Sequence, residues 1–300
     1  MSHVPVLLHA SIDGLNLKED GVYVDVTFGG GGHTQELLNR LGVRGTVIAF
    51  DQDEAAKDRL PNDERLVFVN ENFRHLKRFL RFHGFKKVDG VLADLGMSSF
   101  QLDSETRGFA ARFDAPLDMR MAQHAKTTAE DVVNTYSAQQ LQTVFQLYGE
   151  IRNSKTLAQT IVQARNGAKL ETTGQLKAAV DSIVKGNKAR YYAQLFQALR
   201  IEVNDEMGAL KDLLEQAQQV LKPNGRLSVI SFHSLEDRLV KNYMKTGTFD
   251  GNVEKDLYGN FYTPLKAITK KPIIPSDDEM KINPRSRSAK LRIAERIADE

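Results

Sequence analysis

The sequence of 300 residues contains no cysteine. This absence excludes disulfide bonds, zinc or iron–sulfur sites with cysteine ligands, and a cysteine nucleophile. No run of about 18 apolar residues occurs, so we expect no membrane-spanning helix. The short apolar stretch at residues 4–8 follows no basic run and does not predict a signal peptide. We therefore expect a cytoplasmic protein.

Proline is also scarce, with 8 residues, while 41% of the chain is hydrophobic and 27% is charged. These values are typical of a globular protein, and the length suggests about two domains. The formal charge is −3 over residues 1–103 (12 basic, 15 acidic), +5 over 104–200 (13 basic, 8 acidic) and 0 over 201–300 (16 of each). The basic middle section favours a polyanionic partner, although solvated helices also carry such charge.

The first third of the chain alternates between two kinds of segment. Four short runs rich in β-branched and aromatic residues predict strands at 22–26, 46–50, 66–69 and 88–93. Apolar residues at helical spacing lie between them, at 35–41, 54–60 and 73–80. This alternation predicts a parallel sheet covered by helices on both faces.

The middle of the chain has helical spacing throughout, and Thr172 or Thr173 is a candidate N-cap. A helix from about 205 to 221 should end at the Pro-Asn-Gly turn of residues 223–225, before a fifth strand at 227–231. We therefore predict an α/β fold: a Rossmann-like, doubly wound domain made of residues 1–103 and 201–300. An all-helical insertion of residues 104–200 would interrupt it and serve substrate recognition.

The first strand leads into four consecutive glycines, residues 29–32, which favour a ligand loop over a plain turn. A dinucleotide fingerprint needs a third glycine where Thr34 stands, so S-adenosylmethionine is a better ligand than NAD. Asp51 follows the second strand, where an acid accepts hydrogen bonds from ribose hydroxyls. Asp51 and Asp53 have an alternative interpretation as helix N-caps, which is stronger for Asp53. We predict no metal site.

Polar residues also follow the fourth and fifth strands. Asp94 and Ser98 come after the fourth, and His233 and Ser234 come after the fifth. Ligands bind at the carboxyl ends of parallel strands, so these loops should share one cleft. We predict catalytic roles for Asp94, Ser98 and His233, in which Asp94 or a neighbour orients a substrate amine and His233 or Ser234 holds the nucleobase. The alternative for His233 and Ser234 is that they cap the following helix.

These residues belong to motifs through which the sequence resembles the ribosomal RNA small subunit methyltransferase H family, which methylates N4 of a cytosine in 16S ribosomal RNA. The motifs that carry the resemblance are HVPVL (3–7), DVTFGGGGH (25–33), DLGMSS (94–99), QLD (101–103), RGF (107–109), PLDMRM (116–121), QALRI (197–201), VN (203–204), ISFHSLEDR (230–238) and NPRSRSAKLR (283–292). They span nearly the whole chain in family order.

The resemblance implies a class I S-adenosylmethionine-dependent methyltransferase domain split by a helical insertion, acting on a cytidine in the decoding centre of the small ribosomal subunit. The positions it implies for cofactor contact are Gly31, Gly32, His33, Asp51, Phe73, Asp94 and Gln101. Methylation at cytosine C5 ordinarily uses a cysteine adduct and cytosine deaminases use cysteine-ligated zinc, so the lack of cysteine is consistent with direct attack by the amine.

The C-terminal segment 281–294 contains basic residues and no acid, so we expect Arg285, Arg287 and Lys290 to contact RNA. Leu291 and Ile293 alternate like an edge strand, so part of this segment should be structural. The predicted partner is small-subunit ribosomal RNA or the subunit itself, with no membrane. The rival functions are a DNA amino-methyltransferase, a non-catalytic RNA-binding assembly factor and, more distantly, an NAD oxidoreductase.

Overall fold

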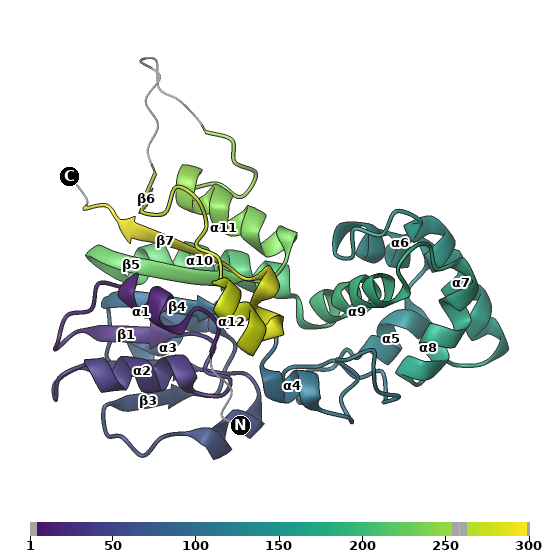
Figure 1. Ribbon diagram of the computed structural model, residues 1–300, viewed down its shortest axis with the longest axis horizontal. Coiled ribbons are helices and arrows are strands. Elements are labelled where there is room, and N and C mark those ends of the chain that lie inside the picture. Colours follow the sequence, from purple (N-terminus) through teal and green to yellow (C-terminus); the bar gives the residue numbers. More distant parts are fainter. Residues whose placement is uncertain (1–4, 254–257, 259–262, 299–300) are drawn as a thin grey trace. The chain divides into compact units, whose positions relative to one another are not determined.

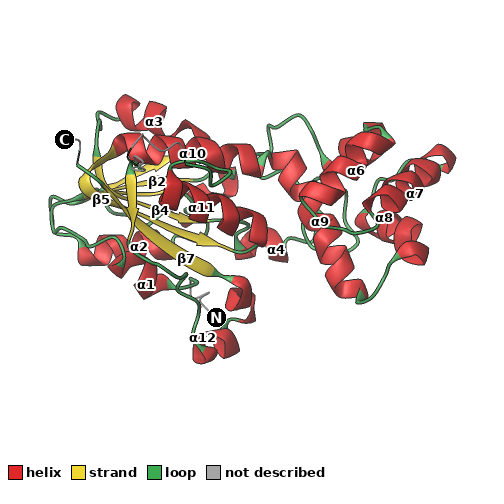
Figure 2. Ribbon diagram, turned by 90° about the horizontal axis from the view of Figure 1, so that it is seen from above, coloured by secondary structure: helices red, strands yellow, loops and turns green. Residues whose placement is uncertain are grey.

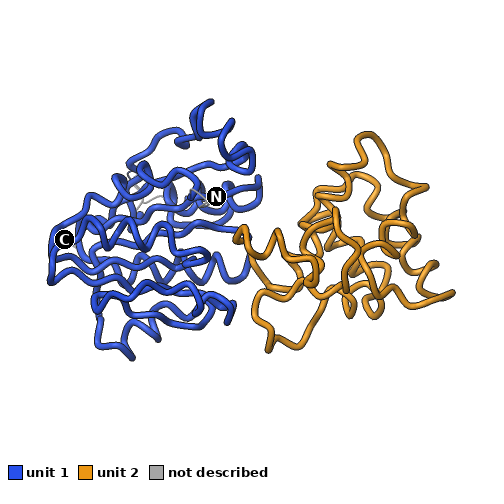
Figure 3. Tube along the Cα trace, turned by 60° about the horizontal axis from the view of Figure 1, so that its bottom comes forward, with its two compact units in different colours: residues 1–97, 207–300 blue, residues 98–206 orange. Residues whose placement is uncertain are grey.

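The computed structural model describes residues 5–253, 258 and 263–298. His3 and Val4, which begin the first family motif, lie outside the described residues. The chain divides into two compact units, residues 1–97 with 207–300 and residues 98–206 (Figure 3). The second unit thus extends a few residues beyond the range 104–200 at each end. Among the described residues, no helix is long and apolar enough to cross a membrane.

In the described part of the first unit, seven strands form one sheet in the order β3-β2-β1-β4-β5-β7-β6 (Figure 1). Strands β1 to β5 are parallel, and β7 is antiparallel to both β5 and β6. The strand order reverses between β1 and β4, which is where open α/β sheets bind ligands. The strands are β1 Val22–Asp25, β2 Thr46–Phe50, β3 Leu66–Val69, β4 Val88–Asp94, β5 Leu221–Ser231, β6 Leu265–Ala267 and β7 Lys290–Arg296.

Two details of the predicted sheet are wrong. Strand β7 is not an edge strand, because β6 pairs with its outer side. Only the first of the three residues of β6 is buried, so β6 lacks an apolar pattern that could reveal it. The turn expected at residues 223–225 lies inside β5, where Asn224 has a φ of 62° and the register against β4 shifts between Val88 and Gly90.

Both faces of the sheet are covered by helices (Figure 2). Val24, Ile48 and Val91 lie in one core with α3, α10 and α11, whereas Tyr23 and Val47 lie in another with α1 and α2. This alternation follows from the period of two along a strand and accounts for the continuous apolar runs of the strands. The helices of this unit are α1 Leu8–Asp13, α2 Gly32–Arg40, η1 Glu54–Arg59, η2 Phe73–His75, α3 Leu76–Phe82, α10 Glu206–Val220, α11 Ser234–Thr246, α12 Asp277–Ile282 and η4 Pro284–Ser288. The first residue of α10, Glu206, is counted with the second unit.

The second unit contains helices α4 Ser99–Asp103, α5 Ala129–Thr135, α6 Ala138–Leu147, α7 Ser154–Gly167, α8 Thr173–Val180, η3 Asp181–Ile183 and α9 Lys188–Asn204. Capping residues in the sequence identify the first turns of several of these helices. Thr128, Ser137 and Thr172 form capping boxes at α5, α6 and α8, so of the two candidate caps near 172 the first is the N-cap. Leu141, Phe145 and other apolar residues at helical spacing are fully buried in this unit.

Candidate active site

Three acids lie at the carboxyl ends of neighbouring parallel strands. Asp25 ends β1, Asp51 follows β2 and Asp94 ends β4. Burial is the main cause that raises the pKa of Asp25 and of Asp51 to about 6. The pKa of Asp94 is raised well above its ordinary value, first by burial and then by the charges of Asp25 and Glu236. This edge of the sheet is therefore a site where negative charge is costly without a positive partner.

Asp25 is fully buried and accepts hydrogen bonds from the Thr34 hydroxyl at 2.8 Å and the Thr27 N–H at 3.1 Å. The Thr27 hydroxyl also accepts a hydrogen bond from the Asp94 N–H at 2.7 Å. Thr27 thus connects the ends of β1 and β4. No role for Asp25 or Thr27 was predicted from the sequence, where Thr34 served only to exclude NAD. The available signal was a threonine two residues after an acid that ends a strand.

The glycine loop has a packing role in addition to any role in ligand binding. Gly31 is the N-cap of α2 and has a φ of 79°, which favours glycine. A Cβ on Gly32 would lie 2.1 Å from Cγ of Pro5, so a side chain there would displace the N-terminal segment. The N-cap of α2 supplies no side-chain cap, so the N–H groups of Gly32 and His33 remain available to an anionic ligand group.

Asp51 is held by backbone N–H groups of the loop that follows it and of the glycine loop. Its two carboxylate oxygens accept hydrogen bonds from the N–H groups of Gly29 and Asp53, each at 2.8 Å. Each oxygen retains a second lone pair, which is what a ribose hydroxyl requires. Asp53 is the N-cap of η1 and accepts the Ala55 N–H at 3.2 Å, as the alternative interpretation predicted for it. Phe73, the first residue of η2, is partly buried against the core beneath α3 and α10.

His33 lies next to Asp94 but does not neutralise it. The Nε2 atom of His33 lies 3.3 Å from the Val6 carbonyl oxygen, and Nδ1 lies 3.8 Å from Oδ2 of Asp94. Burial lowers the pKa of His33 to about 4, so the ring is neutral near pH 7. Its Nε2–H then donates to Val6, and Nδ1 faces Asp94 without a proton. The other Asp94 oxygen, Oδ1, is buried and has no hydrogen-bond partner among the described residues.

Two of the predicted site residues, Ser98 and Gln101, belong to the second unit. Ser98 is the N-cap of α4, and its hydroxyl accepts the Gln101 N–H at 3.2 Å. The Gln101 side chain is buried, and its carbonyl oxygen accepts the Ser98 N–H at 3.1 Å. The pair therefore forms a capping box, and the catalytic role of Ser98 and the cofactor contact of Gln101 stay predictions.

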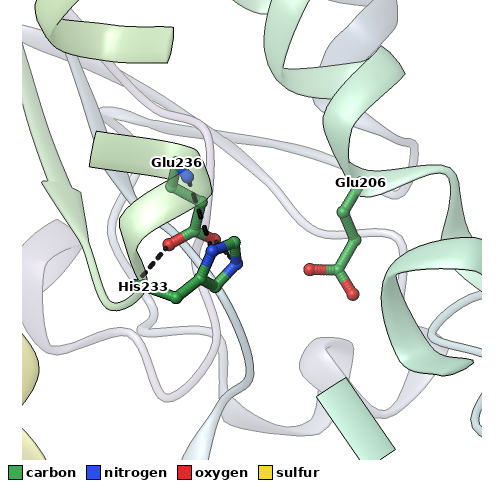
Figure 4. Close-up of side chains that lie close together, drawn as sticks. All are labelled: Glu206, His233 and Glu236. Carbon is green, nitrogen blue, oxygen red and sulfur yellow. Dashed lines mark hydrogen bonds and ion pairs between the residues drawn. The ribbon is translucent and has the colours of Figure 1, made fainter. Parts of the chain in front are cut away.

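His233 caps the helix that follows it, the alternative that the sequence left open (Figure 4). Its Nδ1 accepts the Glu236 N–H at 3.4 Å, while a Glu236 carboxylate oxygen accepts the Phe232 N–H at 2.8 Å. Since Nδ1 accepts a hydrogen bond, the ring carries a proton on Nε2. Nε2 is buried and lies 3.1 Å from Oε1 of Glu236, but it makes no hydrogen bond within the described chain. The Nε2–H of His233 can therefore be donated to a ligand. Glu206, also drawn, belongs to the second unit.

The side chains of the predicted basic segment differ in their exposure to solvent. Arg285 and Arg287 are exposed on η4, on either side of the buried Ser286. Lys290, at the start of β7, forms an ion pair with Asp237 at 3.2 Å. Arg292 pairs with the same carboxylate at 2.7 Å and is almost fully buried. The segment thus combines a structural half, as the alternation at 291 and 293 predicted, with an exposed basic half.

Comparison with known proteins agrees with the resemblance seen in the sequence. A model described as the MraW methylase family matches residues 1–297. The ribosomal RNA small subunit methyltransferase H of Flavobacterium johnsoniae is 56% identical over 296 residues, covering 98% of each chain. The protein of the same name from Bacteroides fragilis is 53% identical over 295 residues, covering 98% of this chain and 97% of its own.

A third relative with this name, from Flavobacterium psychrophilum, is 55% identical over 291 residues, covering 97% of this chain and all of its own. The parallel sheet, its order and the helices on both faces match the predicted class I methyltransferase fold, and the expected cofactor, S-adenosylmethionine, is confirmed with it. The match over nearly the full length shows that this chain is a methyltransferase that belongs to the MraW methylase family.

Proposed function

We propose that this methyltransferase transfers a methyl group to N4 of a cytidine in small-subunit ribosomal RNA, in the decoding centre. The names of relatives more than half identical to this chain support the RNA substrate. The observation that carries the chemistry is Asp94, an acid at the switch point of the sheet with one buried carboxylate oxygen that lacks a partner among the described residues. A positively charged cofactor would supply a favourable charge near this oxygen, and an amine substrate would supply a hydrogen-bond donor.

The residues of the first unit fit S-adenosylmethionine, which supplies an electrophilic methyl group on a positively charged sulfonium when bound. Asp51 has lone pairs left for the ribose hydroxyls. The uncapped N-terminus of α2 offers N–H groups to the carboxylate of the cofactor. The unneutralised charge of the Asp25 and Asp94 carboxylates favours the cationic groups of the cofactor.

Asp94 has the properties required to handle the amine of cytosine. That amine is a weak nucleophile because its lone pair is delocalised into the ring, so the enzyme must position it and remove a proton. An oxygen that accepts no hydrogen bond within the described chain can accept one from the amine N–H. The raised pKa of Asp94 makes its ionised form a stronger base than an exposed aspartate.

His233 complements Asp94 by donating a hydrogen bond. Its Nδ1 is used in the cap of α11, which leaves the Nε2–H for an acceptor on the nucleobase, such as N3 or O2 of cytosine. A donor for the ring and an acceptor for the amine together match the hydrogen-bonding pattern of the cytosine edge. The N-cap also fixes the orientation of the imidazole ring, so the donor is held before the substrate arrives.

Exposed basic groups support RNA as the polymer that is bound. Arg285 and Arg287 on η4 are exposed to solvent, where phosphates can reach them, whereas Lys290 is partly engaged with Asp237. The helical second unit, whose residues 104–200 carry a charge of +5 (13 basic, 8 acidic), would contribute to substrate recognition. The proposed partner is the ribosomal RNA or the small subunit that contains it, and an enzyme with this substrate works in the cytoplasm.

Nucleoside mass spectrometry of ribosomal RNA from cells that lack this protein tests the proposal. N4-methylcytidine should disappear from small-subunit RNA and return when the wild-type gene is restored. Unchanged N4-methylcytidine would reject the proposal. With purified protein, labelled methyl groups should enter ribosomal RNA over many turnovers. Label in DNA would favour an amino-methyltransferase acting on DNA, and binding without turnover would favour an assembly factor.

A further inference from the structure

The second unit contains a polar hollow whose residues come from α6, from the start of α7 and from the segment between them. Its volume is about 390 Å³, which lies within the range of small-ligand sites. The residues that line it are Gln142, Gln146, Glu150, Ile151, Arg152, Ser154 and Lys155. Six of these seven residues are polar or charged, so the hollow is suited to a hydrophilic group.

The N-terminus of α7 opens into this hollow without a cap. Asn153 occupies the N-cap position, but its side chain donates to the Ile183 carbonyl at 3.1 Å and accepts from the Tyr191 hydroxyl at 3.2 Å. Within the fully described second unit, the N–H groups of Lys155 and Thr156 have no acceptor. A 14-residue helix with free N–H groups at its start carries a partial positive charge there.

Ser154 provides a second, independent observation. It is the first residue of α7, it lines the hollow, and only 6% of it is exposed. Its hydroxyl makes no hydrogen bond to any residue that the structure describes, although its own backbone N–H donates to Ile151. The hydroxyl of a nearly buried residue that has no protein partner is expected to bond to a ligand or to water. It lies beside the same free N–H groups.

The side chains around the hollow add positive charge. Arg152 and Lys155 are exposed and form no ion pair with other described residues. Glu150 supplies one negative charge to the same lining. Two cations, one anion and the positive end of a helix leave a net positive potential, which excludes a cationic ligand and favours an anion.

We propose that this hollow binds a backbone phosphate of the substrate RNA, through the N–H groups of Lys155 and Thr156, the Ser154 hydroxyl and the side chain of Arg152 or Lys155. Phosphate oxygens accept several hydrogen bonds at once, which is what this set of donors provides. The RNA source rests on the proposed function, whereas the anion site itself depends only on the donors. A phosphate contact here would fix the register of the RNA without reading its sequence.

The anion site is tested by titrating the full-length protein with inorganic phosphate, at constant ionic strength, while the amide resonances of Lys155 and Thr156 are followed by NMR. These two amides should shift and saturate. In Thr156→Glu, a carboxylate beside the free N–H groups competes with phosphate and favours the helix N-terminus, so the shifts should vanish while the fold is kept. Gln163→Glu adds the same charge to an exposed position further along α7 and should bind phosphate normally.

RNA binding is then compared between the same two variants at low salt. Thr156→Glu should weaken affinity about 5- to 10-fold and reduce the salt slope by nearly one, relative to Gln163→Glu. If the amide resonances of Lys155 and Thr156 do not shift with phosphate, the anion site is rejected, even if the wild type methylates ribosomal RNA. Phosphate binding with equal RNA affinity in both variants would overturn the RNA assignment. Failure of the wild type to methylate any RNA would instead reject the proposed function and leave the amide result valid.

Discussion

Two regions of the first unit carry their charge in opposite ways. At the carboxyl edge of the sheet, Asp25, Asp51 and Asp94 are withdrawn from solvent and their pKa values are raised. On η4, Arg285 and Arg287 are exposed to solvent. Buried charge interacts strongly at short range, whereas exposed charge is screened by salt and acts weakly at each contact.

The contrast determines what each region can bind. A buried acid carries a desolvation cost in the free protein, which a specific cationic ligand recovers, so the sheet edge suits one small molecule in one orientation. Exposed arginines gain little individually but act together on a polymer through the release of counterions. The protein thus separates a selective cofactor site from an additive polyanion surface.

The largest expected effect concerns Asp94. Asp94→Asn keeps the size of the side chain but removes its charge and its ability to take a proton, so single-turnover methylation should slow by about 100- to 1000-fold. The wild-type rate should rise with pH because Asp94 must be ionised, and the variant should lose this dependence. Asp53→Asn is a matched control, since asparagine preserves the N-cap of η1. A variant Asp94→Asn with near wild-type rate and normal cofactor binding contradicts the assignment.

The next effect is the pH dependence of stability due to Asp25. Its pKa of about 6 in the folded protein exceeds its ordinary value of 3.8, so the folded state binds a proton more tightly. This contribution to the free energy of unfolding is full below about pH 4 and is lost as pH rises to 6 and above. Two pKa steps correspond to about 3 kcal/mol. The free energy of unfolding, measured with urea, should therefore fall less between pH 4 and 7 in Asp25→Asn than in the wild type.

Asp63 offers the control for this experiment. Hydrogen bonds from Arg65 lower the pKa of Asp63 to about 2, so its titration falls outside the window from pH 4 to 7. Asp63→Asn should leave the pH dependence in that window unchanged. Equal slopes in the wild type and Asp25→Asn would show that the acid is not held in a buried site.

A smaller effect is expected at the glycine loop. Gly32→Ala places a Cβ 2.1 Å from Pro5 and should cost about 1–3 kcal/mol of unfolding free energy, with weaker cofactor binding. At Gly167, the last residue of α7, an added Cβ would meet no heavy atom within 4 Å, and the backbone does not need a positive φ. Gly167→Ala should therefore be neutral or slightly stabilising. Thermal unfolding of both variants measures the contrast. Equal stability would mean that the loop moves freely away from Pro5.

Much of the sheet edge was predictable because strand pattern and strand direction together place it. The runs at 46–50 and 66–69 coincide with β2 and β3, and acids that end parallel strands must meet at one edge. Contacts that depend on side-chain rotamers were not predictable. The hydrogen bond from Thr34 to Asp25 joins residues on a strand and a helix, and the use of Nδ1 of His233 as a cap depends on its χ angles.

The basic segment 281–294 also contains contacts that could not be predicted from the sequence. A count of basic residues treats Arg285, Arg287, Lys290 and Arg292 alike, since no sequence pattern reports the ion pairs with Asp237. That carboxylate lies on α11, more than fifty positions away in the chain. The long-range pairs with Asp237 therefore hold Lys290 and Arg292 against the fold, and only the structure shows that Arg285 and Arg287 are the exposed cations.

The smallest expected effect tests whether this separation matters for RNA. Arg285→Gln with Arg287→Gln removes two exposed cations, so the slope of log affinity against log salt should fall by about 1.4–1.8 in magnitude. Lys290→Gln should change the slope less, because this side chain already pairs with Asp237. Affinity for S-adenosylmethionine should be unchanged in the double variant, which isothermal titration checks in parallel with RNA binding. If Lys290→Gln matched the effect of one exposed arginine, its ion pair would open on RNA binding. If the double variant also lost cofactor affinity, the two regions would not be separate.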